Sequence, residues 1–282
     1  MRTKVIISIV GAILILAGCA SEMRTPKEIC PGKDSVAEAL AALQSQAQKA
    51  VSLKASGQCR LEFYVEGKKK PQKENVDIRL RVNPPAEIYL WGDKPLVSKA
   101  IVLGSNEQEF WLAIRPKEVS LYGWGKWSEQ GSTGGLIIDP RTLLEAFGMS
   151  EVDAEQDWSL SNEGAFDVLT RRESGAVTKN IHIYSCEYQV SRIELFDSKG
   201  QVAACAELDS YEEVSEGFYV PAWIEVTTFT QDEARDPLTI TLRLKSIVSS
   251  KEWPGVIFKR PPPRGFKNVG VVVNGKWIEQ PQ

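Results

Sequence analysis

Few side chains in this sequence could form a catalytic or metal-binding site. The chain has 282 residues, one histidine (His182) and five cysteines. It contains no H-E-x-x-H, G-x-S-x-G, P-loop or C-x-x-C motif, the spacings that would indicate metal, acyl-transfer or nucleotide chemistry. His182 lies between Ile181 and Ile183 and would face water on a strand, and the pair Glu212–Glu213 is typical of solvated charge. We therefore expect no enzyme activity, no metal ion and no cofactor.

Cys19 has the clearest chemical role, because of the residues that precede it. Arg2 and Lys4 are followed by a mostly apolar run over residues 5–16, and then by Ala17 and Gly18. This order is typical of a secretory signal peptide, and the run is shorter than the roughly 20 residues of a membrane-spanning helix. We expect residues 1–18 to be removed. An ordinary signal peptide with an incidental cysteine is the alternative.

The stretch Leu16-Ala17-Gly18-Cys19 resembles the lipobox of bacterial lipoproteins. The resemblance implies that Cys19 is acylated, with palmitate or similar chains, and becomes the first residue of the mature protein. Each buried methylene contributes about 0.8 kcal/mol, so two or more chains hold a protein firmly on a membrane. Ala20 after the cysteine implies, by the same resemblance, a protein anchored in the outer membrane and facing the periplasm.

The other cysteines are Cys30, Cys59, Cys186 and Cys205. An exported protein meets an oxidising compartment, so disulfide bonds are expected. Four cysteines allow three connectivities, and the sequence does not choose among them. Proximity along the chain favours Cys30–Cys59 and Cys186–Cys205. Metal binding is the weaker interpretation, because the chain has only one histidine.

Charge and length limit the partners and the number of domains. The 34 basic and 37 acidic residues give a net charge of −3, which becomes about −5 once Arg2 and Lys4 are removed. No basic excess suggests nucleic acid. We expect a tether over residues 19–33, one domain over 34–264 and a C-terminal tail over 265–282.

Periodicity predicts an α+β fold dominated by antiparallel strands. Ser35 and Glu38 have capping-box spacing at the start of a helix, and a second helix begins at Pro140 and ends before Gly148. Between and after the helices, about ten or eleven segments alternate apolar and polar residues, a pattern of strands with one dry and one wet face. A sheet of that size must curl. The dry face would include Leu61, Phe63, Val65, Ile78, Leu80, Ile240 and Leu242.

Seven segments in this order resemble lipoprotein carriers of the LolA/LolB type. They are the opening helix over 35–54, then 56–63, Asn106-Glu-Gln-Glu-Phe-Trp-Leu112, 140–148, 193–200, 220–226 and 258–265. The resemblance implies a strongly curved, half-open β-barrel whose helices cover a concave apolar face. It also implies a cavity that binds acyl chains of lipids or lipoproteins, and a periplasmic carrier protein as a partner. The lipobox makes the chain more like the membrane-anchored receptor than the soluble carrier.

Two alternatives stay open. The seven dry-face residues could line an acyl-chain cavity or fill a solid core. Trp124 and Trp127, in a segment expected to be a loop, could contact the membrane or cargo, or could pack at a strand end. A filled core would favour a sensory or scaffolding lipoprotein that binds a protein partner.

Overall fold

The structure is a computed structural model that describes residues 28–64, 70–115, 120–129, 140–150, 152–229, 237–273 and 276–280. The predicted signal peptide, Cys19 and Val65 lie outside these residues. Within the described ranges, no helix has the length and apolar character needed to cross a membrane.

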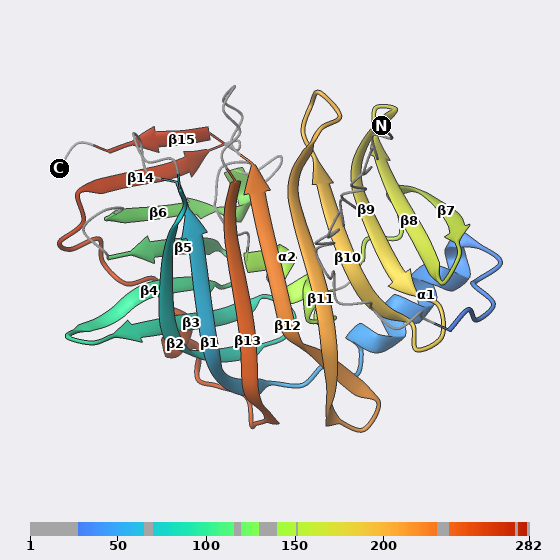
Figure 1. The fold of residues 1–282 in the computed structure, drawn as a ribbon, viewed down its shortest axis with the longest axis horizontal. Helices are drawn as coiled ribbons and strands as arrows, with labels where there is room; N and C mark the ends of the chain where they lie inside the picture. The colour runs from blue at the N-terminus through green and yellow to red at the C-terminus, as the bar shows by residue number, and fades with distance from the viewer. Residues whose placement is uncertain are drawn as a thin grey trace, which may run out of the picture.

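The strands form one open, curved sheet in the order β15-β14-β6-β5-β4-β3-β2-β1-β13-β12-β11-β10-β9-β8-β7 (Figure 1). Neighbours are antiparallel except β14 and β6, which run parallel. The described residues contain fifteen strands, so the prediction of ten or eleven was too low. Their bounds are β1 (Leu53–Phe63), β2 (Gln72–Asn83), β3 (Glu87–Lys94), β4 (Val97–Ser105), β5 (Glu109–Ile114), β6 (Leu121–Lys126), β7 (Asp157–Glu163), β8 (Phe166–Glu173), β9 (Ala176–Tyr184), β10 (Gln189–Phe196), β11 (Val202–Ser215), β12 (Phe218–Phe229), β13 (Pro237–Ser249), β14 (Asn268–Val273) and β15 (Lys276–Glu279).

Two α-helices lie on the concave face of this sheet (Figure 1). The first, α1 (Val36–Ala47), begins as predicted, because the Ser35 hydroxyl accepts a hydrogen bond from the backbone N–H of Glu38. The second, α2 (Pro140–Ala146), is followed by Gly148 at φ +68°, a conformation that glycine adopts without strain. The predicted α+β half-barrel with helices on its concave side is confirmed.

A second apolar cluster covers the other face of β3–β6. Tyr89, Trp111 and Tyr122 alternate along their strands with residues of the concave core and pack against Phe258 and Phe266. Phe258 and Phe266 belong to residues 250–267, which we name the C-terminal strap and which include the short helix η2 (Gly255–Phe258). Strands β3–β6 are therefore covered on both faces.

The stretch expected to be a C-terminal tail adds strands to the sheet. Asn268 of β14 is aligned with Leu121 of β6, and β14 continues to pair with β15. Val272 in β14 is buried with Phe110 and with Trp127 of the short helix η1 (Trp127–Glu129). Residues after the strap thus belong to the folded body.

Candidate functional site

The concave face is one continuous apolar core. Leu61, Ile78, Leu80, Ile240 and Leu242 are all buried in it together with the apolar sides of both helices. Phe63 is partly buried and packs against the same core. The structure therefore brings together all the predicted dry-face residues that it describes, but as a packed core. Whether they bind acyl chains stays a prediction.

One pocket on this face is small compared with an acyl chain. This pocket, of about 20 Å³, lies between the ends of the two helices and strands β10–β12. That volume holds about one water molecule. Its lining residues are Gln46, Ala146, Gly148, Gln189, Val190, Tyr211, Gly217, Phe218 and Tyr219.

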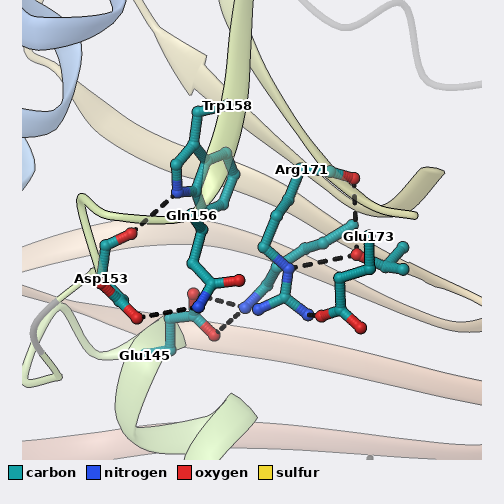
Figure 2. Close-up of polar contacts among 8 residues, drawn as sticks. Glu145, Asp153, Gln156, Trp158, Arg171 and Glu173 are labelled. Atoms are coloured by element: carbon teal, nitrogen blue, oxygen red, sulfur yellow. Dashed lines mark hydrogen bonds and ion pairs between the residues drawn. The ribbon is translucent and has the colours of Figure 1, made fainter. Parts of the chain in front are cut away.

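Helix α2 closes the middle of the concave face with a short apolar side. Leu143 and Leu144, with Phe147 just after the helix, are almost fully buried in the concave core. On its polar side, Glu145, labelled in Figure 2, accepts hydrogen bonds from the Lys179 ammonium of β9, at 2.6 Å for one carboxylate oxygen. Both side chains are mostly buried, with 18% and 11% of their surface exposed. The guanidinium of Arg141 also lies over the Trp127 ring, 3.8 Å from its centroid.

Further polar contacts lie in the segment after α2 and on the neighbouring strands β7 and β8 (Figure 2). The Trp158 indole donates to the Asp153 carbonyl oxygen at 2.9 Å. The Gln156 amide and the Glu155 backbone N–H donate to the Asp153 carboxylate and lower its pKa. Arg171 pairs with Glu173 at 3.0 Å at a more exposed position. The Trp158 hydrogen bond thus joins the segment after α2 to β7.

Helix α1, in contrast, is fastened to the sheet at both ends. Before the helix, Cys30 is disulfide-bonded to Cys186, and the Lys33 backbone N–H donates to the fully buried carboxylate of Asp167 at 2.9 Å. Near its C-terminal end, the Gln46 amide donates to the Tyr188 carbonyl oxygen at 2.8 Å. Helix α1 is thus held by a disulfide bond and by hydrogen bonds on both of its sides along the chain.

The disulfide corrects the predicted pairing. Cys30 bonds to Cys186, whereas Cys59 and Cys205 are free thiols. Cys59 lies in β1 and Cys205 in β11, so neither of the pairs favoured by proximity along the chain is formed. Burial raises the pKa of the Cys59 thiol to about 12.

The segment expected to be an indole-bearing loop is instead strand β6 followed by η1. Trp127 is buried, and its indole N–H donates to the Asn106 carbonyl oxygen at 2.8 Å. Trp124 is partly exposed, with the Arg260 guanidinium 4.0 Å from its ring centroid. Trp127 thus packs inside the fold, and a membrane or cargo contact stays a prediction only for Trp124.

No local sequence motif marks Glu145, Lys179 or Asp167 as site residues. Lys179, Ile181 and Ile183 occupy every second position along β9, so the Lys179 side chain lies on the same dry face as the two isoleucines. A lysine at such a position is the sequence signal that indicates a charge on the dry face. His182, in the opposite phase, lies 3.3 Å from a carboxylate oxygen of Glu194 on the other face. Among the described residues, no group of three or more His, Cys, Asp or Glu side chains could hold a metal ion.

No protein-family model and no curated protein matches the sequence. Solved structures do match the fold. An outer membrane lipoprotein-sorting protein domain from Vibrio parahaemolyticus has a TM-score of 0.55 at 10% identity, over 79% of this chain and 95% of that one. The chain has a LolA-like fold. A DUF1329 family protein from Desulfovibrio piger has a TM-score of 0.51 at 12% identity, over 81% and 98% of the two chains.

A LolA superfamily protein from Nitrosomonas europaea is also similar, with a TM-score of 0.48 at 7% identity over 81% of this chain and 99% of that one. At these identities the likeness concerns the LolA-like fold and leaves the ligand to be argued from the site itself.

Proposed function

We propose that this protein is a lipid-anchored binding protein of the bacterial envelope that accepts acyl chains on its concave face without any covalent chemistry. In this proposal residues 1–18 are removed, Cys19 is acylated, and the domain faces the periplasm from the outer membrane. The cargo is an acylated lipoprotein or a lipid, received from a periplasmic carrier protein.

The observation that carries the proposal is the way α2 closes the concave core. Helix α2 has only seven residues, yet its apolar side lies in the same cluster as Leu61 and Leu80. Moving it would expose a continuous apolar surface on the concave face. The LolA-like fold supports this arrangement, because its curved sheet leaves one side open.

The free energy of burial favours the exchange of α2 for an acyl chain. Exposing Leu143, Leu144 and Phe147 would cost about 2 kcal/mol for each side chain, or roughly 6 kcal/mol in all. A palmitoyl chain that took their place would contribute about 12 kcal/mol if it were fully buried. An acyl chain could therefore replace α2 on the sheet, whereas water could not. In the protein without cargo, α2 would cover the concave face. In the protein with cargo, the acyl chain would cover it.

A second candidate is a sensory or scaffolding lipoprotein that binds a protein partner. The filled concave core favours it, because the described pocket holds only about one water molecule. In that case α2 would remain in place throughout the functional cycle.

Native mass spectrometry would separate the two. A chain of residues 20–282, which retains every described residue, is exported behind a cleavable signal peptide without a lipobox and purified from the periplasm without detergent. We expect an added mass that extracts into organic solvent and is identified as acylated. A clean mass with no uptake of added fluorescent lipid or acylated peptide would contradict acyl-chain binding and favour the scaffold.

A further inference from the structure

On the convex face, away from α1 and α2, an arginine is held between two indole rings. The Arg81 guanidinium of β2 lies 5.2 Å from the ring centroid of Trp91 in β3 and 4.6 Å from that of Trp253 in the C-terminal strap. All three side chains are partly exposed. Such contacts fix a guanidinium while leaving its N–H donors available. In the part of the chain that the structure describes, Arg81 makes no hydrogen bond or ion pair.

The arrangement is built into the fold. Asn83, only 4% exposed, accepts a hydrogen bond from the Trp253 backbone N–H and donates one to its carbonyl oxygen, both at 2.9 Å. The Trp253 indole donates to the Leu53 carbonyl oxygen at 3.2 Å. Three hydrogen bonds thus hold the strap's indole against β1 and β2, and the position beside Arg81 is formed in advance of any ligand.

A second cation stands beside this arginine. Lys54 of β1 is the direct cross-strand partner of Arg81, and it is exposed. Like charges directly opposite each other destabilise a sheet unless something neutralises them. Among the described residues Lys54 also has no ion pair. The other cations of these strands have carboxylate partners within the chain, since Arg79 pairs with Asp93, and Arg60 and Lys73 share Glu62.

An exposed aliphatic side chain lies beside Lys54, and a second one lies in the strap. Val248 of β13 is the other cross-strand partner of Lys54 and is 41% exposed. Val256, three residues after Trp253, is 65% exposed. Indoles, exposed aliphatic groups and unneutralised cations together are typical of a surface at the level of lipid head groups. The whole chain carries a net charge of −3, so this positive site runs against the overall charge.

We propose that Lys54, Arg81, Trp91 and Trp253, which we name the arginine–indole site, bind the phosphate groups of an anionic phospholipid membrane. The guanidinium and the ammonium supply charge-assisted hydrogen bonds to phosphate oxygens. Val248 and Val256 enter the head-group layer beside them. The convex face then lies on the bilayer, and the concave face points away from it.

The test is vesicle binding by the chain of residues 20–282, which lacks Cys19 and so cannot be lipid-anchored. Vesicles of phosphatidylcholine with and without phosphatidylglycerol are compared by flotation. We expect salt-sensitive binding only when phosphatidylglycerol is present. The double variant Lys54→Gln/Arg81→Gln should bind about 25-fold more weakly, about fivefold for each cation.

The matched control is Arg60→Gln/Arg79→Gln, which removes the same charge from the same two strands. We expect this control to lose less than about threefold, because Glu62 and Asp93 already neutralise those cations. Equal loss in the two double variants would overturn the proposal, since it would show dependence on net charge alone. Equal binding to vesicles without phosphatidylglycerol, or no binding at all, would also overturn it.

Two further ligands distinguish the source of the anion. Inorganic phosphate and polyglutamate are titrated while tryptophan fluorescence is followed. Arg81-dependent binding of either ligand without vesicle binding would assign the site to free phosphate or to an acidic protein. It would overturn the proposal that the site binds a membrane. Acyl-chain uptake by the concave face should be unchanged in Lys54→Gln/Arg81→Gln. A failure of the membrane-binding proposal can therefore be told apart from a failure of the proposed acyl-chain binding.

Discussion

Glu145 at the end of α2 and Lys179 in β9 form a mostly buried ion pair that fastens the helix to the concave face (Figure 2). In Glu145→Gln the Lys179 ammonium loses its carboxylate partner. We expect the free energy of unfolding to fall by about 2 kcal/mol and the uptake of lipid to become faster, because α2 separates more readily. Urea unfolding and stopped-flow uptake of a fluorescent fatty acid measure the two effects.

The matched control for this variant is Glu173→Gln, which breaks the more exposed pair with Arg171. We expect the control to change the free energy of unfolding by less than about 0.5 kcal/mol and to leave the uptake rate unchanged. If Glu145→Gln takes up lipid no faster than this control, α2 is not the element that opens.

The disulfide Cys30–Cys186 closes a long stretch of chain, with a sequence separation of 156. Replacing both cysteines by serine should lower the free energy of unfolding by about 2–5 kcal/mol, whereas Cys205→Ser should have little effect. Peptide mapping of the chain of residues 20–282 without reduction should show two alkylated thiols, Cys59 and Cys205. A peptide linking Cys30 to Cys59 would contradict the structure.

Cys59 makes stability depend on alkaline pH. Its pKa is raised to about 12 in the folded protein by burial, against an ordinary value of 9.0. Between these values the unfolded chain releases a proton that the folded protein retains, so stability is fully present below pH 9 and falls as the pH rises towards 12. The expected slope from this thiol is about 1.4 kcal/mol per pH unit.

Urea unfolding of wild type and Cys59→Ala between pH 8 and about 10, below the range where tyrosines ionise, measures this slope. The variant should start less stable, because it leaves a small cavity, but should lose less stability with rising pH. Parallel pH curves for the two proteins would show that the thiol is already ionised or accessible in the folded state.

Gly32 lies against the buried carboxylate that holds the start of α1. A Cβ at this position would stand 2.1 Å from the nearer carboxylate oxygen of Asp167 and 2.2 Å from the Asn162 amide nitrogen. Gly32→Ala should therefore destabilise the protein by about 1–3 kcal/mol. Gly255→Ala is the control, because the nearest atom to its Cβ would be 3.8 Å away. Equal thermal stability of the two variants would show that this contact is not tight.

Alternation predicted the concave face well, because β1, β2 and β13 have one wet face and one dry face. The same alternation did not reveal strands β7, β14 and β15. Strands β14 and β15 follow the proline-rich strap and are short, and β7 is largely exposed, so none of the three has a clear apolar period. Trp124 and Trp127 were expected in a loop, because a strand covered on both faces lacks the alternation by which strands are recognised.

The contacts that position the candidate site are distant in sequence, and this is why they were missed. Cys30 meets Cys186 only because the segment before α1 crosses the ends of β8–β10, so proximity along the chain favoured the wrong pairing. The strap's Trp253 likewise reaches Asn83 across the sheet. Local patterns identify a buried face, but not which distant segment covers it.

The central claim is that acyl chains take the place of α2. Hydrogen exchange of the chain of residues 20–282, with and without an acylated peptide, tests it most directly. The reporters are the backbone N–H groups of Phe147 and Met149, which donate to the carbonyl oxygens of Leu143 and Leu144. We predict that they exchange faster when the peptide is bound, while α1 and β9 remain protected. Unchanged protection of Phe147 and Met149 while the acylated peptide is bound would contradict the claim.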